Sequence, residues 1–159
     1  MNSSSKLVTM LLMFIGAAPG STGGGVKVTT FIILIFSVTA YIRGKEDINI
    51  IRRKVPENIV KKSFAIIGFA LMLIFTTSFI LMINGTGSFS ECVFEAISAF
   101  GTVGLSTGIT PSLNVFGKFI IIITMFIGRV GPISAALSIY SLKNGKIAYK
   151  YPEGKITVG

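Results

Sequence analysis

Residues 88–111, SFSECVFEAISAFGTVGLSTGITP, decide the fold of this chain. Ser88 and Glu91 have the spacing of a capping box, which favours the start of a helix. Residues 89–100 are rich in apolar side chains and predict a helix about 18 Å long, too short to cross a hydrocarbon core of roughly 30 Å. Residues 101–108 then predict an extended return segment that ends before Pro111. This pattern is typical of a re-entrant half-helix, which enters a membrane and leaves it on the same side.

The apolar stretches on both sides of this segment are long enough to span a membrane. Residues 63–83 carry no charge over 21 positions, and residues 115–142 carry only Lys118 and Arg129 over 28 positions. About 20 apolar residues suffice for a spanning helix. The sequence therefore predicts an all-α integral membrane protein with an outer helix at 63–83, a pore helix at 89–100 and an inner helix at 115–142.

Basic residues are distributed unevenly along the chain. Residues 43–62 contain seven lysines and arginines and residues 143–159 contain four, whereas residues 84–114 contain none. This asymmetry follows the positive-inside rule, so we expect a multi-pass plasma-membrane protein with the loop 43–62 and the C-terminal tail 143–159 in the cytoplasm. Binding to nucleic acid, the other interpretation of the net charge of +9, does not require such alternation and is not expected.

A glycine run interrupts the first apolar part of the chain. Residues 7–18 and 26–42 are apolar, and Pro19 and the sequence GSTGGG at 20–25 separate them. Glycine costs about 1 kcal/mol relative to alanine inside a helix, so the run predicts a broken helix. Non-helical backbone at membrane depth is tolerated against protein or a water-filled cavity. A secretory signal peptide at 7–18 is the alternative. A phosphate-binding loop is not expected, because Val26 stands before the lysine.

The half-helix and the segment after it have the features of a cation pore. The C-terminal end of the half-helix carries about half a negative charge and points toward the membrane centre. The backbone carbonyls of Thr102, Val103 and Gly104 can then replace the water shell of a cation. Arg129 lies near the middle of its apolar stretch, where an arginine costs at least about 2.5 kcal/mol, so we expect it to face the pore. Pro132 predicts a kink of the inner helix beside it.

Few side chains in the sequence could support enzymatic chemistry. The chain has no histidine and one cysteine, which excludes a histidine-based triad and a zinc cluster, and no enzyme is expected. Glu91 and Glu95 lie four residues apart on one face of the half-helix. Glu91 is predicted to cap the helix. Glu95 has two interpretations, a charge at the outer mouth or a packed polar contact.

Four motifs together resemble those of the Trk/Ktr/HKT superfamily of potassium transporters, most closely the KtrB-type membrane subunits. They are MFIGAAPGSTGGGVKVTT at 13–30, FGTVGLSTGITP at 100–111, GRVGP at 128–132 and KYPEGKITVG at 150–159. The resemblance implies a channel-like repeat of helix, re-entrant pore helix and helix at 63–142. It also implies that residues 1–42 are the second helix of the preceding repeat, so that the chain resembles the C-terminal part of a longer protein with four repeats.

The resemblance also implies functional residues and partners. The implied selectivity filter is Thr102, Val103, Gly104, Leu105 and Ser106, and the implied gate loop is Gly20, Ser21, Thr22, Gly23, Gly24 and Gly25 with Lys27. Arg129 is implied to close or tune the pore together with that loop. The implied cargo is potassium, with sodium as the alternative, and no cofactor is expected in this chain. The implied partners are the lipid bilayer, the remaining repeats, a second copy in a homodimer and a cytoplasmic nucleotide-binding regulatory subunit.

Two other functions remain open at this stage. The chain could be a non-conducting membrane-interaction protein whose glycines serve only helix packing. It could also be a single-repeat subunit of a tetrameric cation channel, although Leu105 and Ser106 stand where such channels have tyrosine and glycine.

Overall fold

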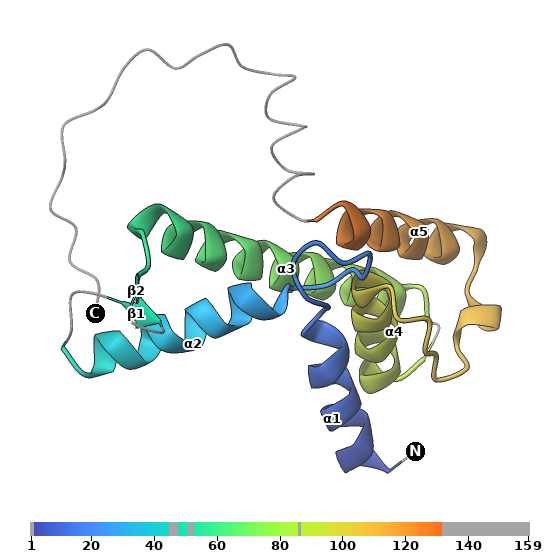
Figure 1. Ribbon diagram of the computed structural model, residues 1–159. Helices are drawn as coiled ribbons and strands as arrows, with labels where there is room; N and C mark the ends of the chain where they lie inside the picture. The colour runs from blue at the N-terminus through green and yellow to red at the C-terminus, as the bar shows by residue number, and fades with distance from the viewer. Residues whose placement is uncertain (1, 45–47, 51–52, 86, 132–159) are drawn as a thin grey trace, which may run out of the picture.

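Helices carry the fold of the computed structural model, which describes residues 2–44, 48–50, 53–85 and 87–131 (Figure 1). The elements in chain order are α1 (Ser3–Phe14), α2 (Val28–Ile42), β1 (Asn49–Ile50), β2 (Arg53–Lys54), α3 (Glu57–Ile83), α4 (Phe89–Gly101), the 3-10 turn η1 (Thr110–Ser112) and α5 (Val115–Val130). The prediction of a helical protein is therefore confirmed for these residues. The structure adds one antiparallel pair of two-residue strands, β1 and β2, within the basic loop.

The short helix α4 lies at the centre of the packing. It contacts α1, α3 and α5, and its residues enter all three buried apolar clusters. Ala96 and Phe100 pack with Val26 and two residues of α3, while Cys92 and Phe94 belong to the other two clusters. α4 begins where expected, because the Ser88 backbone N–H and hydroxyl donate to Glu91 Oε2 at 2.9 and 2.8 Å. Its position makes α4 the support for whatever follows its C-terminal end.

The helix α3 is longer than the uncharged stretch predicted. It begins at Glu57 instead of residue 63. The prediction counted only uncharged residues, whereas the first turns of a helix accept charged side chains. Lys61 and Glu57 lie one turn apart and form an exposed ion pair at 3.4 Å. Of the helices described, α3 is the one long and apolar enough to cross a membrane, and shorter apolar helices lie at Ser4–Phe14 and Val28–Ile42.

The predicted break in the first apolar region lies between α1 and α2. α1 ends at Phe14, four residues before the expected end at 18, because the chain closes a loop there through backbone pairing. Gly16 donates to the Val26 carbonyl at 2.7 Å, and Val26 donates to the Phe14 carbonyl at 3.2 Å. These two bonds form the neck of a loop over residues 16–26.

The helix α5 ends at Val130, beside Arg129, where the sequence predicted a kink within a helix over residues 115–142. Gly131 follows with a φ of 95°, which a helix cannot contain, and its N–H donates to the Ile127 carbonyl at 3.0 Å. The chain therefore leaves helical geometry one residue before Pro132, the residue expected to kink the helix. Residues 132–142 and the tail 143–159 lie outside the described residues.

Candidate functional site

The segment after α4 begins with a left-handed residue. Thr102 ends the helix with a φ of 53°, and among the described residues it is the one non-glycine with a positive φ. This conformation is rare for a β-branched residue and costs of order 1–3 kcal/mol, so the surroundings must hold it. Gly104 follows with a φ of 83°, which glycine adopts without a side-chain clash. The chain turns sharply at the negative end of the α4 dipole.

The backbone carbonyls of residues 102–104 accept no hydrogen bond from the described residues, whereas the carbonyl of Leu105 accepts one. The Leu105 carbonyl accepts a hydrogen bond from the Ser98 hydroxyl at 2.5 Å, which turns it toward α4. Within the part of the chain that the structure describes, no N–H or hydroxyl donates to the carbonyls of Thr102, Val103 or Gly104. Three consecutive acceptors are thus left for a ligand beside the end of α4. A cation is the ligand that both the carbonyls and the dipole favour.

The Glu95 side chain binds residues 106–110, the second half of the segment that follows α4. Its side chain is 5% exposed, and it accepts hydrogen bonds from the Thr107 backbone N–H at 3.0 Å and the Thr110 hydroxyl at 3.1 Å. The Ser106 hydroxyl donates to the same carboxylate. Of the two interpretations drawn from the sequence, the structure has the packed polar contact. The sequence carried no signal for these partners, because they lie 11 to 15 residues away.

The glycine loop of residues 20–25 reaches Thr102, the first residue after α4. The Gly24 backbone N–H donates to the Thr102 hydroxyl at 3.0 Å. A Cβ at Gly24 would lie 2.8 Å from that hydroxyl and 3.0 Å from the Phe100 carbonyl oxygen, so only glycine permits this approach. Gly24, Gly25 and Val26 are buried. The structure therefore brings together the two segments that the sequence singled out, although 78 residues separate them.

Lys27, rather than Arg129, holds the carbonyls of this loop. Its ammonium group donates to the Gly23 carbonyl at 2.6 Å and to the Ser21 carbonyl at 3.4 Å. Arg129 is exposed on α5, and within the described ranges no hydrogen bond joins it to the loop. Its neighbour Gly128 lies directly against the Phe100 carbonyl, which places this part of α5 beside the end of α4.

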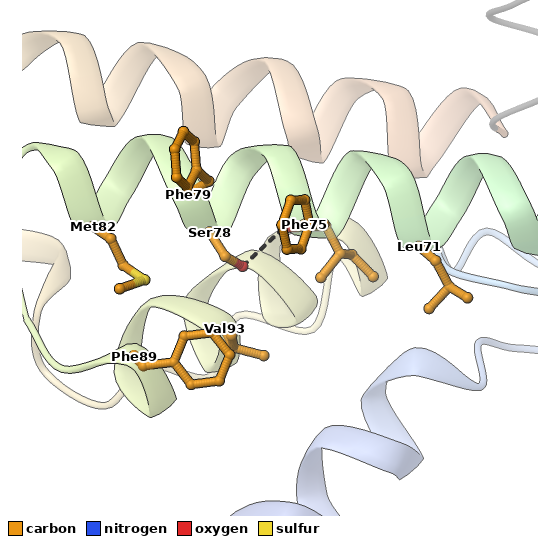
Figure 2. Close-up of a pocket in the computed structure, with 8 residues that line it drawn as sticks. Leu71, Phe75, Ser78, Phe79, Met82, Phe89 and Val93 are labelled. Carbon is orange, nitrogen blue, oxygen red and sulfur yellow. Dashed lines mark hydrogen bonds between the residues drawn. The ribbon is translucent and has the colours of Figure 1, made fainter.

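A separate groove of about 440 Å³ lies between α3 and α4 (Figure 2). Seven of its eight lining residues are apolar, namely Leu71, Ile74, Phe75, Phe79, Met82, Phe89 and Val93. The eighth, Ser78, donates its hydroxyl to the Ile74 carbonyl at 2.8 Å. With its one polar side chain satisfied in this way, the groove offers nothing that would replace the water shell of a cation.

Comparisons with known proteins show which family this chain is similar to. A family model described as TrkH, a cation transport protein, matches residues 1–148. The Ktr system potassium uptake protein B of Bacillus subtilis (strain 168) is 43% identical over 159 residues, which are 100% of this chain and 35% of that protein. The protein of the same name from Vibrio alginolyticus is 40% identical over 153 residues, 96% of this chain and 33% of that protein. The potassium/sodium uptake protein NtpJ of Enterococcus hirae is 37% identical over 164 residues, 100% of this chain and 36% of that protein. The chain thus spans about a third of the length of these relatives.

Proposed function

Because the chain belongs to the TrkH family of cation transport proteins, we propose that its full-length protein takes up potassium across the plasma membrane and that this segment supplies one pore repeat. The observation that carries the proposal is the row of three carbonyls at 102–104, which lack donors among the described residues and lie at the negative end of α4. The names of two relatives specify potassium uptake, and the third specifies potassium or sodium. Potassium is therefore the proposed cargo, with sodium as the alternative to be tested.

The proposed arrangement in the membrane is an outer helix, a re-entrant pore helix and an inner helix. α3 would span the bilayer as the outer helix, and α5 would line the pore as the inner helix. The 13 residues of α4 extend about 20 Å, which suits a helix that enters from outside and stops near the middle. The basic loop 43–62 and the C-terminal tail would lie in the cytoplasm.

The glycine loop is proposed as a gate below the filter. Its support is the hydrogen bond from Gly24 to Thr102, which places the loop against the first residue of the carbonyl row. Arg129 is proposed to face the same pathway from α5. The exposed side of the segment, where Val103 is 44% and Leu105 is 49% exposed, would meet the filter strands of the remaining repeats. On the family resemblance, we also propose that the full-length protein forms a homodimer and binds a cytoplasmic nucleotide-binding regulatory subunit.

The test replaces Gly104 by serine in the full-length transporter. Gly104 has a φ of 83° and open space around a Cβ, so the substitution strains the backbone at the carbonyl row without a packing clash. We expect the ratio of potassium to sodium uptake to fall in cells that lack other potassium uptake systems. Gly85→Ser is a matched control, because Gly85 also has a positive φ of 66° and open space but lies in the turn before α4.

The two variants distinguish the filter from general strain. A normal uptake ratio in a normally expressed Gly104→Ser protein would contradict the assignment of the carbonyl row. An equal loss in Gly85→Ser would show that strain anywhere in this region lowers selectivity. Measuring both ions at matched expression also determines whether potassium or sodium is the preferred cargo.

A further inference from the structure

The buried carboxylate of Glu95 binds residues 106–110, which follow the carbonyl row at 102–104. We infer that Glu95 is a positioning residue that sets ion selectivity by holding residues 106–110 in place. The inference rests on the proposed function, because it takes residues 101–108 as the filter. Glu95 itself does not touch the ion in this account. It acts through the hydrogen bonds that fix the backbone after the carbonyl row.

Both carboxylate oxygens of Glu95 accept hydrogen bonds from residues 106–110. Oε1 accepts from the Thr107 N–H at 3.0 Å and from the Ser106 hydroxyl, and Oε2 accepts from the Thr110 hydroxyl at 3.1 Å. Ser106 in turn accepts from the Gly108 N–H at 2.9 Å. One side chain of α4 therefore binds Ser106, Thr107 and Thr110 directly and reaches Gly108 through Ser106.

The segment between α4 and η1 has no regular secondary structure that would pair its backbone N–H and carbonyl groups. Between the end of α4 and the turn η1 the chain forms neither helix nor strand, and Gly108 has a φ of 102°. Backbone N–H groups still need acceptors when they are withdrawn from water. Glu95 supplies such an acceptor for the N–H of the half-buried Thr107.

Glu95 and Ser98 act from the same side of α4. They lie three residues apart, so their side chains share one face of the helix. Ser98 binds the Leu105 carbonyl through its hydroxyl and the Val103 N–H through its own carbonyl at 3.0 Å. Ser98 thus holds the segment at residues 103 and 105, and Glu95 holds it at 106–110. The carbonyls of 102–104 lie at one end of this segment, so losing the hydrogen bonds of Glu95 is expected to disorder them.

The chemistry of the contact requires a group that only accepts hydrogen bonds. Glutamine at 95 would keep one acceptor oxygen and turn an amide group that only donates toward another donor. Aspartate would keep the charge but is one methylene shorter. A role of Glu95 as a plain negative charge that attracts cations would instead be insensitive to the loss of its partners' hydroxyls.

The experiment therefore changes both sides of the contact in the full-length transporter. We expect Glu95→Gln to lower the ratio of potassium to sodium uptake by about tenfold, the scale of losing one hydrogen bond to a charged group. The pair Ser106→Ala with Thr110→Val removes two such bonds and should lower the ratio at least as much. The pair leaves the carboxylate in place, so it separates positioning from charge. Glu91→Gln is the control, because Glu91 lies one turn earlier on the same helix and, within the described residues, its carboxylate accepts hydrogen bonds from Ser88 instead of the segment after α4. Its ratio should stay normal.

Each result has a definite meaning. A normal ratio in the Ser106/Thr110 pair would overturn the positioning role, whether or not Glu95→Gln folds. If Gly104→Ser changes the ratio and the Glu95 and Ser106/Thr110 variants do not, the inference fails and the proposed function stands. If none of them changes the ratio, the filter assignment itself fails. A change in the potassium concentration for half-maximal uptake with an unchanged ratio would indicate a charge effect and would also overturn the inference.

Discussion

Replacing Gly128 by alanine should push α5 away from α4. A Cβ at Gly128 would overlap the Phe100 carbonyl oxygen and would lie 2.8 Å from its carbonyl carbon, where ordinary contacts begin at 3.4 Å. The obstacle is backbone, so no side-chain rotation can relieve it. Overpacking of this kind typically costs 1–3 kcal/mol. Because Phe100 directly precedes the filter segment, we expect Gly128→Ala both to destabilise the protein and to lower the selectivity of uptake.

The matched control is Gly68→Ala on α3. Both glycines lie inside helices, so alanine brings the same gain in helix propensity of up to about 1 kcal/mol at each position. A Cβ at Gly68 meets nothing within 4 Å, so no packing cost offsets that gain. The difference in unfolding free energy between the two variants is therefore the packing cost alone, about 1–3 kcal/mol.

Titration of the purified full-length protein with a denaturing detergent measures this difference. Gly68→Ala should unfold at the wild-type midpoint or above it, and Gly128→Ala clearly below it. Equal midpoints for the two variants would refute the close contact between α5 and the Phe100 carbonyl.

Two further predictions concern topology and the start of α4. Single cysteines introduced at positions 49 and 86 should react with a membrane-impermeant reagent from opposite sides of the membrane, and labelling of both from one side would contradict the positive-inside assignment. The Ser88 backbone N–H, followed by its hydroxyl, holds the pKa of the Glu91 carboxyl below its ordinary value of 4.5. The stabilisation is therefore present above pH 4.5 and is lost as the pH falls through the lowered pKa. Thermal stability of wild type and Glu91→Gln should accordingly converge at acidic pH, and a constant gap between them would disprove the cap.

The sequence predicted the helical elements from charge and apolar length, and its errors lie where those counts ignore local backbone geometry. The predicted start of α3 at residue 63 was set by Lys62, because only uncharged residues were counted. A helix accepts charged side chains in its exposed turns, as the ion pair of Glu57 and Lys61 shows. The prediction for α5 attributed a kink near Arg129 to Pro132, whereas the helix already ends before Gly131, which has a φ of 95°. α1 ends early because of a long-range backbone contact between Gly16 and Val26, which no local pattern indicates.

The geometry of the candidate site was predictable where it depends on the backbone and unpredictable where it depends on long-range side-chain contacts. The carbonyl row follows from the position of Gly104 after a capped half-helix, so the motif alone suggests it. The partners of Glu95 come from the far side of a turn, and its two interpretations could not be separated without them. The same holds for Lys27, which the sequence placed in the loop without a role.

Lys27 gives the gate hypothesis its clearest test. The sequence suggested that Arg129 and the glycine loop form one gate, whereas the structure shows the Lys27 ammonium bound to the Gly23 and Ser21 carbonyls at 2.6 and 3.4 Å. Lys27→Met keeps an unbranched stem of the same length up to the ε position and removes the ammonium group that makes these bonds. If the closed loop blocks the pathway, releasing it should raise ion flux through the full-length protein in vesicles by about tenfold, the scale of one hydrogen bond to a charged group.

The comparison with Arg129 decides whether one gate or two restrict the flux. Arg129→Ala should raise flux as well, because a fixed positive charge opposes a cation by about 4 kcal/mol at 4 Å and an effective dielectric constant of 20. If the loop and the arginine close one gate, the double variant should gain less in free-energy terms than the sum of the single variants. Lys118→Met, which removes an exposed lysine near the start of α5, is the control and should leave flux unchanged. Fully additive gains would assign the two residues to separate barriers, and unchanged flux in Lys27→Met would show that the closed loop does not limit conduction.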